Sequence, residues 1–263
     1  NGDFLLLAKS ISWIENREPG ADEFLESLQP NLVPIIGVTG PPGAGKSTLI
    51  SSLIEHWVKD GKTVAILSVD PSSPFHKGAI LGDRIRMKDW YMNPNVFIRS
   101  LATRGHLGGL INGMIELTTL LQSVGFDVIL IETVGVGQSE VEIAGLADTT
   151  IVVLVPEAGD EVQMMKSGLM EIAHIFVVNK SDRPDAEAFT NHLLHMMREG
   201  LGDAHSIPVV KTIATQQVGI IELAAAIGAQ QTAGLSSARK KQLLISKLYK
   251  IILQSDICSI IFV

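Results

Sequence analysis

Seven apolar, β-branched runs divide this chain, and helical patterns fill most of the gaps between them. The runs lie at residues 33–39, 63–69, 95–100, 126–132, 149–155, 174–179 and 207–212. Strands that alternate with helices pair mainly in parallel, because each helix carries the chain back across the sheet. The sequence therefore predicts an α/β fold, with a mainly parallel sheet covered by helices on both faces.

Helical patterns also flank the sheet region. Residues 3–28 carry a wide apolar face that needs covering by another surface, formed by Leu5, Leu6, Ala8, Ile11, Trp13 and Ile14. A second pattern runs over 236–254, and we expect a linker at 228–237. We divide the chain into an N-terminal helical extension at 1–30, an α/β domain at 31–232, and a C-terminal helical arm and tail at 233–263.

Composition limits the partners. A chain of 263 residues can bury a large core, and its formal charge of −7 without a basic stretch argues against nucleic acid. The single cysteine, Cys258, excludes an intramolecular disulfide and a multi-cysteine metal site. Apolar runs stay well short of the roughly 20 residues that span a bilayer. We expect a cytoplasmic protein without a membrane partner, although a leader removed before Asn1 remains open.

One glycine-rich segment indicates phosphate binding. It fits the pattern G-x-x-x-x-G-K-[ST] and lies between the run at 33–39 and a helix that we expect to begin at Thr48; its residues are Gly40, Pro41, Pro42, Gly43, Ala44, Gly45, Lys46 and Ser47. The glycines let backbone N–H groups face a β-phosphate, helped by the positive end of the helix. Lys46 would reach the β- and γ-oxygens, and the Ser47 hydroxyl would bind Mg²⁺.

A second short motif indicates which base is bound. Asn179-Lys180-Ser181-Asp182 follows the run at 174–179, where open α/β sheets place ligands. Asp182 can accept the N1–H and the exocyclic NH₂ of guanine, a donor pair that adenine lacks. Asn179 can address the Hoogsteen edge, and the Lys180 stem can cover the ring. Together the two motifs predict GTP or GDP as ligand.

Three acids follow predicted strands or their connections. Asp70 precedes Pro71 at a strand end, and Asp83 lies on the long connection that follows. Glu132 opens Glu132-Thr133-Val134-Gly135, which resembles the D-x-x-G of common GTPases, so that Gly135 could donate an N–H to the γ-phosphate. We expect Asp70 to lie near Mg²⁺ and the connection that carries Asp83 to fold over the nucleotide, and each acid could instead cap a helix or a turn.

Hydrolysis needs an in-line water and neutralisation of charge on the phosphate oxygens. Lys46 and Mg²⁺ can neutralise that charge. No glutamine follows Gly135 directly, since Val136 and Gly137 precede Gln138, and no arginine finger is evident among Arg84, Arg86, Arg99 and Arg104. We therefore predict slow intrinsic turnover that a partner accelerates.

These residues resemble a known family. The strings Gly40–Thr48, Val69–Phe75, Gly82–Met87, Thr103–Gly105, Ile131–Glu140 and Asn179–Asp182 look like those of the MeaB/ArgK GTPases, chaperones of adenosylcobalamin-dependent methylmalonyl-CoA mutase. The similarity runs from about Leu7 to Ile221, and the Ile131–Glu140 string is its most diagnostic part.

The resemblance implies a homodimeric P-loop GTPase of the SIMIBI class that binds the mutase and gates loading of adenosylcobalamin. It puts the magnesium and catalytic acids at Asp70, Asp83 and Glu132, with Ser47 as a further metal ligand. Gln163 and Lys166 match a loop that relays nucleotide state to the partner enzyme. Thr212, Ile213 and Ala214 match a loop that closes over the base, where a backbone N–H could meet guanine O6.

Some positions depart from the family pattern, and other functions stay open. His76-Lys77 stands where small residues are expected, His174 where an acid is usual, and the chain ends soon after the arm. A nickel-delivery GTPase for hydrogenase or urease would need a Cys/His site, for which His192 and His195 at i, i+3 are the nearest candidates. A protein kinase, after the older transport-kinase name, and a nucleotide-dependent scaffold without hydrolysis are the remaining alternatives.

Overall fold

The computed structural model describes residues 3–70, 87–102, 113–133, 143–156, 168–201 and 207–232. Several residues singled out by the sequence lie outside these ranges: Asp83, Gly135, Gln163, Lys166, the pair His76-Lys77, and the arm and tail at 233–263. Asp70 is described as part of its strand, without its side chain.

The described chain forms one seven-stranded sheet, and every pair of neighbouring strands is parallel. The order is β3-β2-β4-β1-β5-β6-β7, with bounds Ile35–Thr39 (β1), Val64–Asp70 (β2), Val96–Ala102 (β3), Val128–Glu132 (β4), Thr149–Leu154 (β5), Ile175–Asn179 (β6) and Val209–Thr212 (β7). The predicted fold is confirmed, and each strand overlaps its predicted run.

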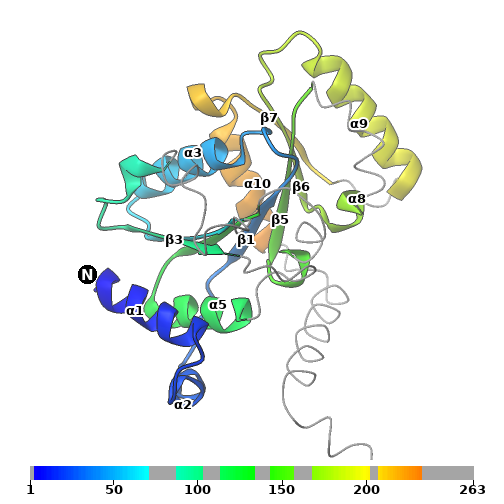
Figure 1. Cartoon of the computed structure of the whole chain (residues 1–263). Helices are drawn as coiled ribbons and strands as arrows, with labels where there is room; N and C mark the ends of the chain where they lie inside the picture. Colours follow the sequence, from blue (N-terminus) through cyan, green and yellow to red (C-terminus); the bar gives the residue numbers. More distant parts are fainter. Residues whose placement is uncertain are drawn as a thin grey trace, which may run out of the picture.

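Helices cover both faces of this sheet (Figure 1). On one face α3 (Lys46–Lys59) and α10 (Ile220–Thr232) pack on alternate residues of the central strands, such as Val38 and Val153. The opposite face carries α1 (Phe4–Glu15) and α5 (Met114–Val124), and beside them α8 (Leu169–Ile172) and α9 (Ala186–Leu201). Both faces are buried, so the strands read as continuous apolar runs instead of alternating ones.

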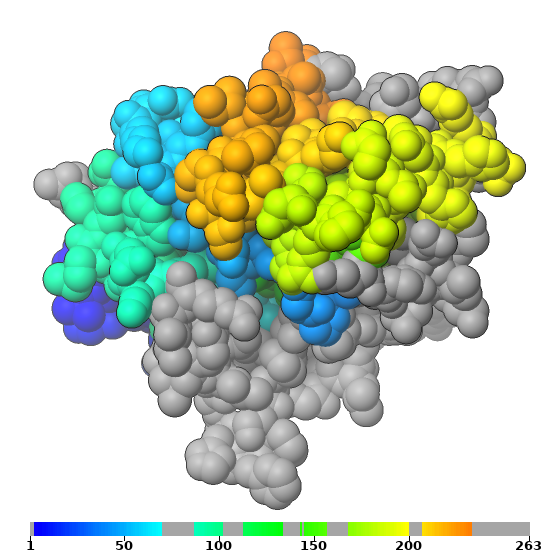
Figure 2. All heavy atoms as spheres, turned by 90° about the horizontal axis from the view of Figure 1, so that it is seen from above, coloured from blue at the N-terminus to red at the C-terminus, as the bar shows by residue number. Residues whose placement is uncertain are grey.

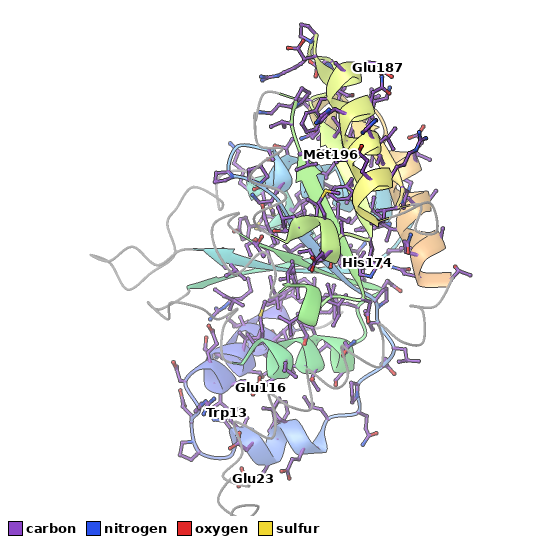
Figure 3. The ribbon with its side chains drawn as sticks, turned by 90° about the vertical axis from the view of Figure 1, so that its right-hand side faces the viewer. Trp13, Glu23, Glu116, His174, Glu187 and Met196 are labelled. Carbon is purple, nitrogen blue, oxygen red and sulfur yellow. The ribbon has the colours of Figure 1, made fainter. Side chains whose placement is uncertain are left out.

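The N-terminal extension packs on the sheet through a narrower face than predicted. Leu7, Ile11 and Ile14 are buried, whereas Leu5 and Leu6 are 67% and 61% exposed. A helix with 3.6 residues per turn presents only one stripe of side chains to the core. The Asp3 carboxylate accepts the N–H groups of Leu5 and Leu6 and so caps the start of this helix. The short helix α2 (Ala21–Ser27) follows, joined to α1 where the Trp13 and Phe24 rings lie 5.5 Å apart (Figure 3).

Two predicted boundaries were wrong. The phosphate-loop helix begins at Lys46 instead of Thr48, because Gly45 adopts a left-handed conformation (φ +89°) and caps the helix there. The expected linker at 228–237 is helical over its described part, since α10 continues to Thr232 through Gly228. A single glycine weakens a helix by only about 1 kcal/mol, so the packing of α10 on the sheet outweighs it.

His174 has a structural use at the position where it departs from the family pattern. Its ring Nδ1 accepts the N–H of Thr150 at 3.0 Å, and its own N–H donates to the Thr150 carbonyl at 2.9 Å. The imidazole therefore ties the start of β6 to β5, inside the molecule and beside α8 (Figure 3). An acid in this place would present a carboxylate where the structure uses a neutral ring nitrogen.

Candidate functional site

The phosphate loop leaves β1 at the point where the strand order reverses. β1 lies between β4 and β5, and open α/β sheets bind ligands outside the carboxyl ends of the strands at such a switch point. Glycine is required at two of its positions. A Cβ on Gly40 (φ +137°) would collide with the carbonyl of Val153, and one on Gly45 would lie 2.5 Å from Asn179 Nδ2.

Lys46 folds over the loop that precedes it. Its side chain is buried, and Nζ donates to the carbonyls of Gly40 at 2.7 Å and Pro41 at 3.1 Å. The ammonium group is therefore held at the mouth of the loop, on the side where the first turn of α3 opens. The positive charge of Lys46 at this position can attract an anion that enters the loop.

Glu132, the last residue of β4, brings its carboxylate to the mouth of the phosphate loop. It is 3% exposed, and its Oε1 accepts the Ser47 hydroxyl at 2.7 Å. Ser68, its register partner on β2, approaches Oε2 at 3.4 Å, a long hydrogen bond. Sequence reasoning missed Ser68, which carries no motif and is brought to Glu132 only by the pairing of β2 with β4.

The Ser47 and Glu132 oxygens fit a hard divalent cation. Mg²⁺ prefers oxygen ligands, and a hydroxyl and a carboxylate oxygen 2.7 Å apart provide two at the mouth of the phosphate loop. Asp70 ends β2, two residues beyond Ser68, so its backbone lies at the same edge. Within the described ranges no three His, Cys, Asp or Glu side chains gather in the manner of a metal site.

The pair His192 and His195 gives no support to a nickel site. His195 Nδ1 lies 3.5 Å from Glu199 Oε2 on the outer surface of α9, where both side chains are about 70% exposed. This is the geometry of a solvated helix face.

A cavity of about 240 Å³ adjoins the phosphate loop. It is lined by Gly45, Thr48, Asn179, Lys180, Asp182, Arg183, Ile213, Ala214 and Thr215. The structure thus brings together the end of the phosphate loop, the Asn179–Asp182 motif and the loop after β7. Arg183 and Thr215 were not predicted from the sequence, since no motif marks them.

Asn179 joins these three segments. Its buried amide donates from Nδ2 to the Ala44 carbonyl at 2.9 Å, and its Oδ1 accepts the Thr212 hydroxyl at 3.1 Å and the Ala214 N–H at 3.2 Å. The contact of Asn179 with the base stays a prediction, and the structure adds a bridge within the protein that the sequence did not reveal. One of the two Nδ2 hydrogens remains for another acceptor.

Lys180 and Asp182 line the cavity from the turn that follows β6. Lys180 has a left-handed backbone (φ +55°), and its Nζ donates to the Gly43 carbonyl at 2.9 Å, so that the stem spans from β6 to the phosphate loop. Asp182 is exposed at the rim.

The loop after β7 closes the cavity on the α3 side. Figure 2 views this edge, where the orange surface of the loop lies between cyan α3 and the yellow-green start of α9. Ile213 donates its N–H to Val218 at 3.1 Å, and the Ala214 N–H is used by Asn179. Both N–H groups thus already have an acceptor within the protein. A hydrogen bond from either of them to guanine O6 would be shared with that acceptor.

Arg99 lies away from this site. Its Nη2 donates to Glu15 Oε2 at 2.7 Å and to the Ser12 hydroxyl at 2.9 Å, joining β3 to α1. Arg99 therefore forms an ion pair within the protein and is directed away from the phosphate loop. Arg84, Arg86 and Arg104 lie outside the described residues.

No described helix has the length and apolar character needed to cross a bilayer. This finding concerns the described residues only.

Comparison with known proteins gives consistent results. A Pyrococcus abyssi protein named as a GTPase is 48% identical over 229 residues, which are 84% of this chain and 70% of that protein. GTPase ArgK of Escherichia coli is 37% identical over 253 residues, covering 92% and 76%. The crystal structure of an LAO/AO transport system kinase superposes with a TM-score of 0.72 at 27% identity, covering 96% of this chain and 80% of that one.

The family model described as "Methylmalonyl Co-A mutase-associated GTPase MeaB" matches residues 7–262, nearly the whole chain. Together with the phosphate loop, the adjoining cavity and the relatives named as GTPases, this match shows that the chain is a GTPase of the MeaB family.

Proposed function

We propose that GTP and GDP bind along the carboxyl edge of the sheet, with the phosphates in the loop from Gly40 to Thr48 and guanine in the adjoining cavity. The observation that carries this proposal is the Asn179 bridge, because its bonds to Ala44, Thr212 and Ala214 make the loop and the cavity one continuous site. A nucleotide that spans both would use the two motifs that the sequence contains.

Asp182 is the residue that selects guanine. Its carboxylate at the rim would accept the N1–H and the 2-amino group, and adenine would leave it without those donors. The Lys180 stem, held across the cavity by the Gly43 carbonyl, would cover one face of the base. The Asn179 amide has one further N–H for the N7 acceptor.

The residues proposed to hold Mg²⁺ are Ser47, Asp70, Asp83 and Glu132. Mg²⁺ would neutralise charge on the β- and γ-phosphates. The hydrogen bond from Ser47 to Glu132 supports a role for both, since it brings a hydroxyl oxygen and a carboxylate oxygen to within 2.7 Å of each other beside the loop. Lys46 would exchange its carbonyl acceptors for phosphate oxygens, and Gly135 would donate an N–H to the γ-phosphate.

Turnover by this set of residues is expected to be slow without a partner. The Arg99 side chain forms an ion pair with Glu15 on α1, so it does not supply a positive charge to the phosphates. The missing neutralisation would come from a rearrangement that the partner induces.

We further propose that the partner is an adenosylcobalamin-dependent acyl-CoA mutase, whose loading with cofactor the GTPase gates. The description of the matching family, which names methylmalonyl-CoA mutase, supports this client. Gln163 and Lys166 are the proposed coupling residues, and the working form is proposed to be a homodimer. These two residues would report to the client whether GTP or GDP is bound.

The deciding experiment measures hydrolysis by the purified chain, alone and with an added mutase of this type, with ATP as control. Selective GTP turnover that rises several-fold with the mutase is expected, and Lys166→Ala should remove the rise while leaving basal turnover intact. Glu132→Gln should abolish turnover; unchanged function in that variant would indicate a scaffold.

GTP turnover that no mutase changes would refute the proposed client. It would not affect the proposed nucleotide site. Transfer of labelled γ-phosphate to a protein would indicate a kinase instead. Stoichiometric nickel binding by the dialysed protein would favour the nickel-delivery alternative.

A further inference from the structure

A buried hydroxyl on α3 contacts the loop that closes the nucleotide cavity. Ser52 is 3% exposed, and its Oγ donates to the Ala214 carbonyl at 2.7 Å. The same oxygen lies 3.1 Å from the Thr48 carbonyl one helical turn earlier, the usual acceptor for a serine within a helix. A hydroxyl has one hydrogen, and the shorter distance favours Ala214 over the local acceptor.

The Ala214 peptide groups are therefore held from both sides. The N–H donates to Asn179 Oδ1 at 3.2 Å, and the carbonyl receives Ser52 at 2.7 Å and the more distant Gln217 N–H at 3.3 Å. Ala214 is itself 4% exposed and lines the cavity. Its position is thus fixed by one contact from β6 and one from α3.

A second contact in the same direction ties the loop to α3. Gln217 has a left-handed backbone (φ +59°), and its Nε2 donates to Glu55 Oε2 at 2.7 Å, three residues along α3 from Ser52. That contact is exposed, so water competes with it. Ser52 provides the buried link.

We propose that Ser52 is a positioning residue for guanine. It sets the distance between the helix that follows the phosphate loop and the wall of the base cavity, and thereby keeps Ala214 against Asn179. Without the hydroxyl, the Ala214 carbonyl keeps only the long bond from the Gln217 N–H, and the wall keeps only its exposed link to α3 through Gln217 and Glu55. The phosphate end is held by other contacts, namely those of Lys46 and Glu132.

This inference rests on the proposed guanine site, and its test separates the two ends of the nucleotide. Calorimetry would measure binding of GDP and of magnesium pyrophosphate to wild type, Ser52→Ala and Ser52→Thr. For Ser52→Ala we expect GDP affinity to fall about 10-fold, equivalent to about 1.4 kcal/mol, with pyrophosphate affinity unchanged within about twofold. Ser52→Thr, which keeps a hydroxyl, should bind GDP within about threefold of wild type.

Hydrolysis gives an independent measurement. Ser52→Ala should raise KM for GTP by about the same factor while kcat at saturation stays within about twofold, because base contacts contribute equally to ground and transition states. The matched control is Ser123→Ala, which removes a serine hydroxyl bonded within its own helix to the Thr119 carbonyl at 2.9 Å. It should change neither KM nor kcat.

Two results would overturn the role of Ser52: wild-type GDP affinity in Ser52→Ala, or equal losses of GDP and pyrophosphate affinity, which would mean a general effect on α3. Partial unfolding would reduce the number of binding sites for both ligands and not the ratio of their affinities. A wild-type chain that binds pyrophosphate but no more GDP than ADP would instead refute the guanine site itself.

Discussion

Replacement of Asn179 by alanine tests the bridge that unites the candidate site. If Asn179 only contacted the base, the variant would lose nucleotide affinity and keep its stability in nucleotide-free solution. The structure predicts otherwise, because its amide makes hydrogen bonds to Ala44, Thr212 and Ala214 at 2.9, 3.1 and 3.2 Å, and all of them are buried. Stability without nucleotide should therefore fall.

The size of the loss follows from the partners left behind. The Thr212 hydroxyl can rotate to another acceptor, whereas the Ala44 carbonyl and the Ala214 N–H are fixed in the backbone. Each buried polar group without a partner costs about 1–3 kcal/mol. The adjoining cavity of about 240 Å³ lets water reach them, which favours the low end of that range. We expect a total loss of about 2–3 kcal/mol.

Denaturant unfolding of the nucleotide-free protein measures this loss, with Asp182→Ala as the matched control. Asp182 lines the same cavity but is exposed, so its removal should change stability by less than about 0.5 kcal/mol. Equal stabilities of wild type and Asn179→Ala, within the same margin, would refute the structural role of the amide. Both variants should weaken GDP binding, whereas only Asn179→Ala should lose stability. The comparison therefore separates the structural role of the Asn179 amide from its role in nucleotide binding.

Three further predictions concern the loop, an ion pair and a carboxylate. Gly45→Ala should bind GDP far more weakly than Gly43→Ala in equilibrium binding, because both have a positive φ but only a Cβ at Gly45 meets Asn179, at 2.5 Å; similar losses would exclude that contact as the cause. Arg99→Ala should lower stability by about 1 kcal/mol, through the partly buried pair with Glu15, and leave kcat for GTP unchanged; a loss of kcat would show that Arg99 acts in catalysis. Hydrogen bonds from the Thr63 backbone and side chain lower the pKa of Asp127 from its ordinary value of 3.8, so the folded state binds this proton less readily than the unfolded state. Its contribution is present above about pH 4 and is lost as pH falls through the lower folded pKa, so Asp127→Ala should be less stable than wild type at pH 7, and the gap should shrink in acid; a gap independent of pH would contradict this.

The sequence predicted the structure wherever the pattern of a short segment is compatible with only one kind of local structure. Continuous apolar runs located every strand of the described residues, because a strand buried on both faces has no polar alternation to interrupt it. The phosphate loop was equally readable, since the spacing of Gly40, Gly45 and Lys46 follows from backbone geometry within a few residues. The start of α3 was misplaced by two residues because a glycine cap, unlike Ser or Asp, leaves no side-chain signal.

By itself, then, the sequence determined the parallel α/β sheet, the phosphate loop and the choice of guanine over adenine as the expected base. Tertiary structure alone decided which residues meet across the site: Ser68 with Glu132, Asn179 with Ala44 and Ala214, and Ser52 with Ala214. The reason is physical, because a motif encodes local backbone geometry, whereas these contacts depend on strand order and register that bring together residues as many as 162 positions apart.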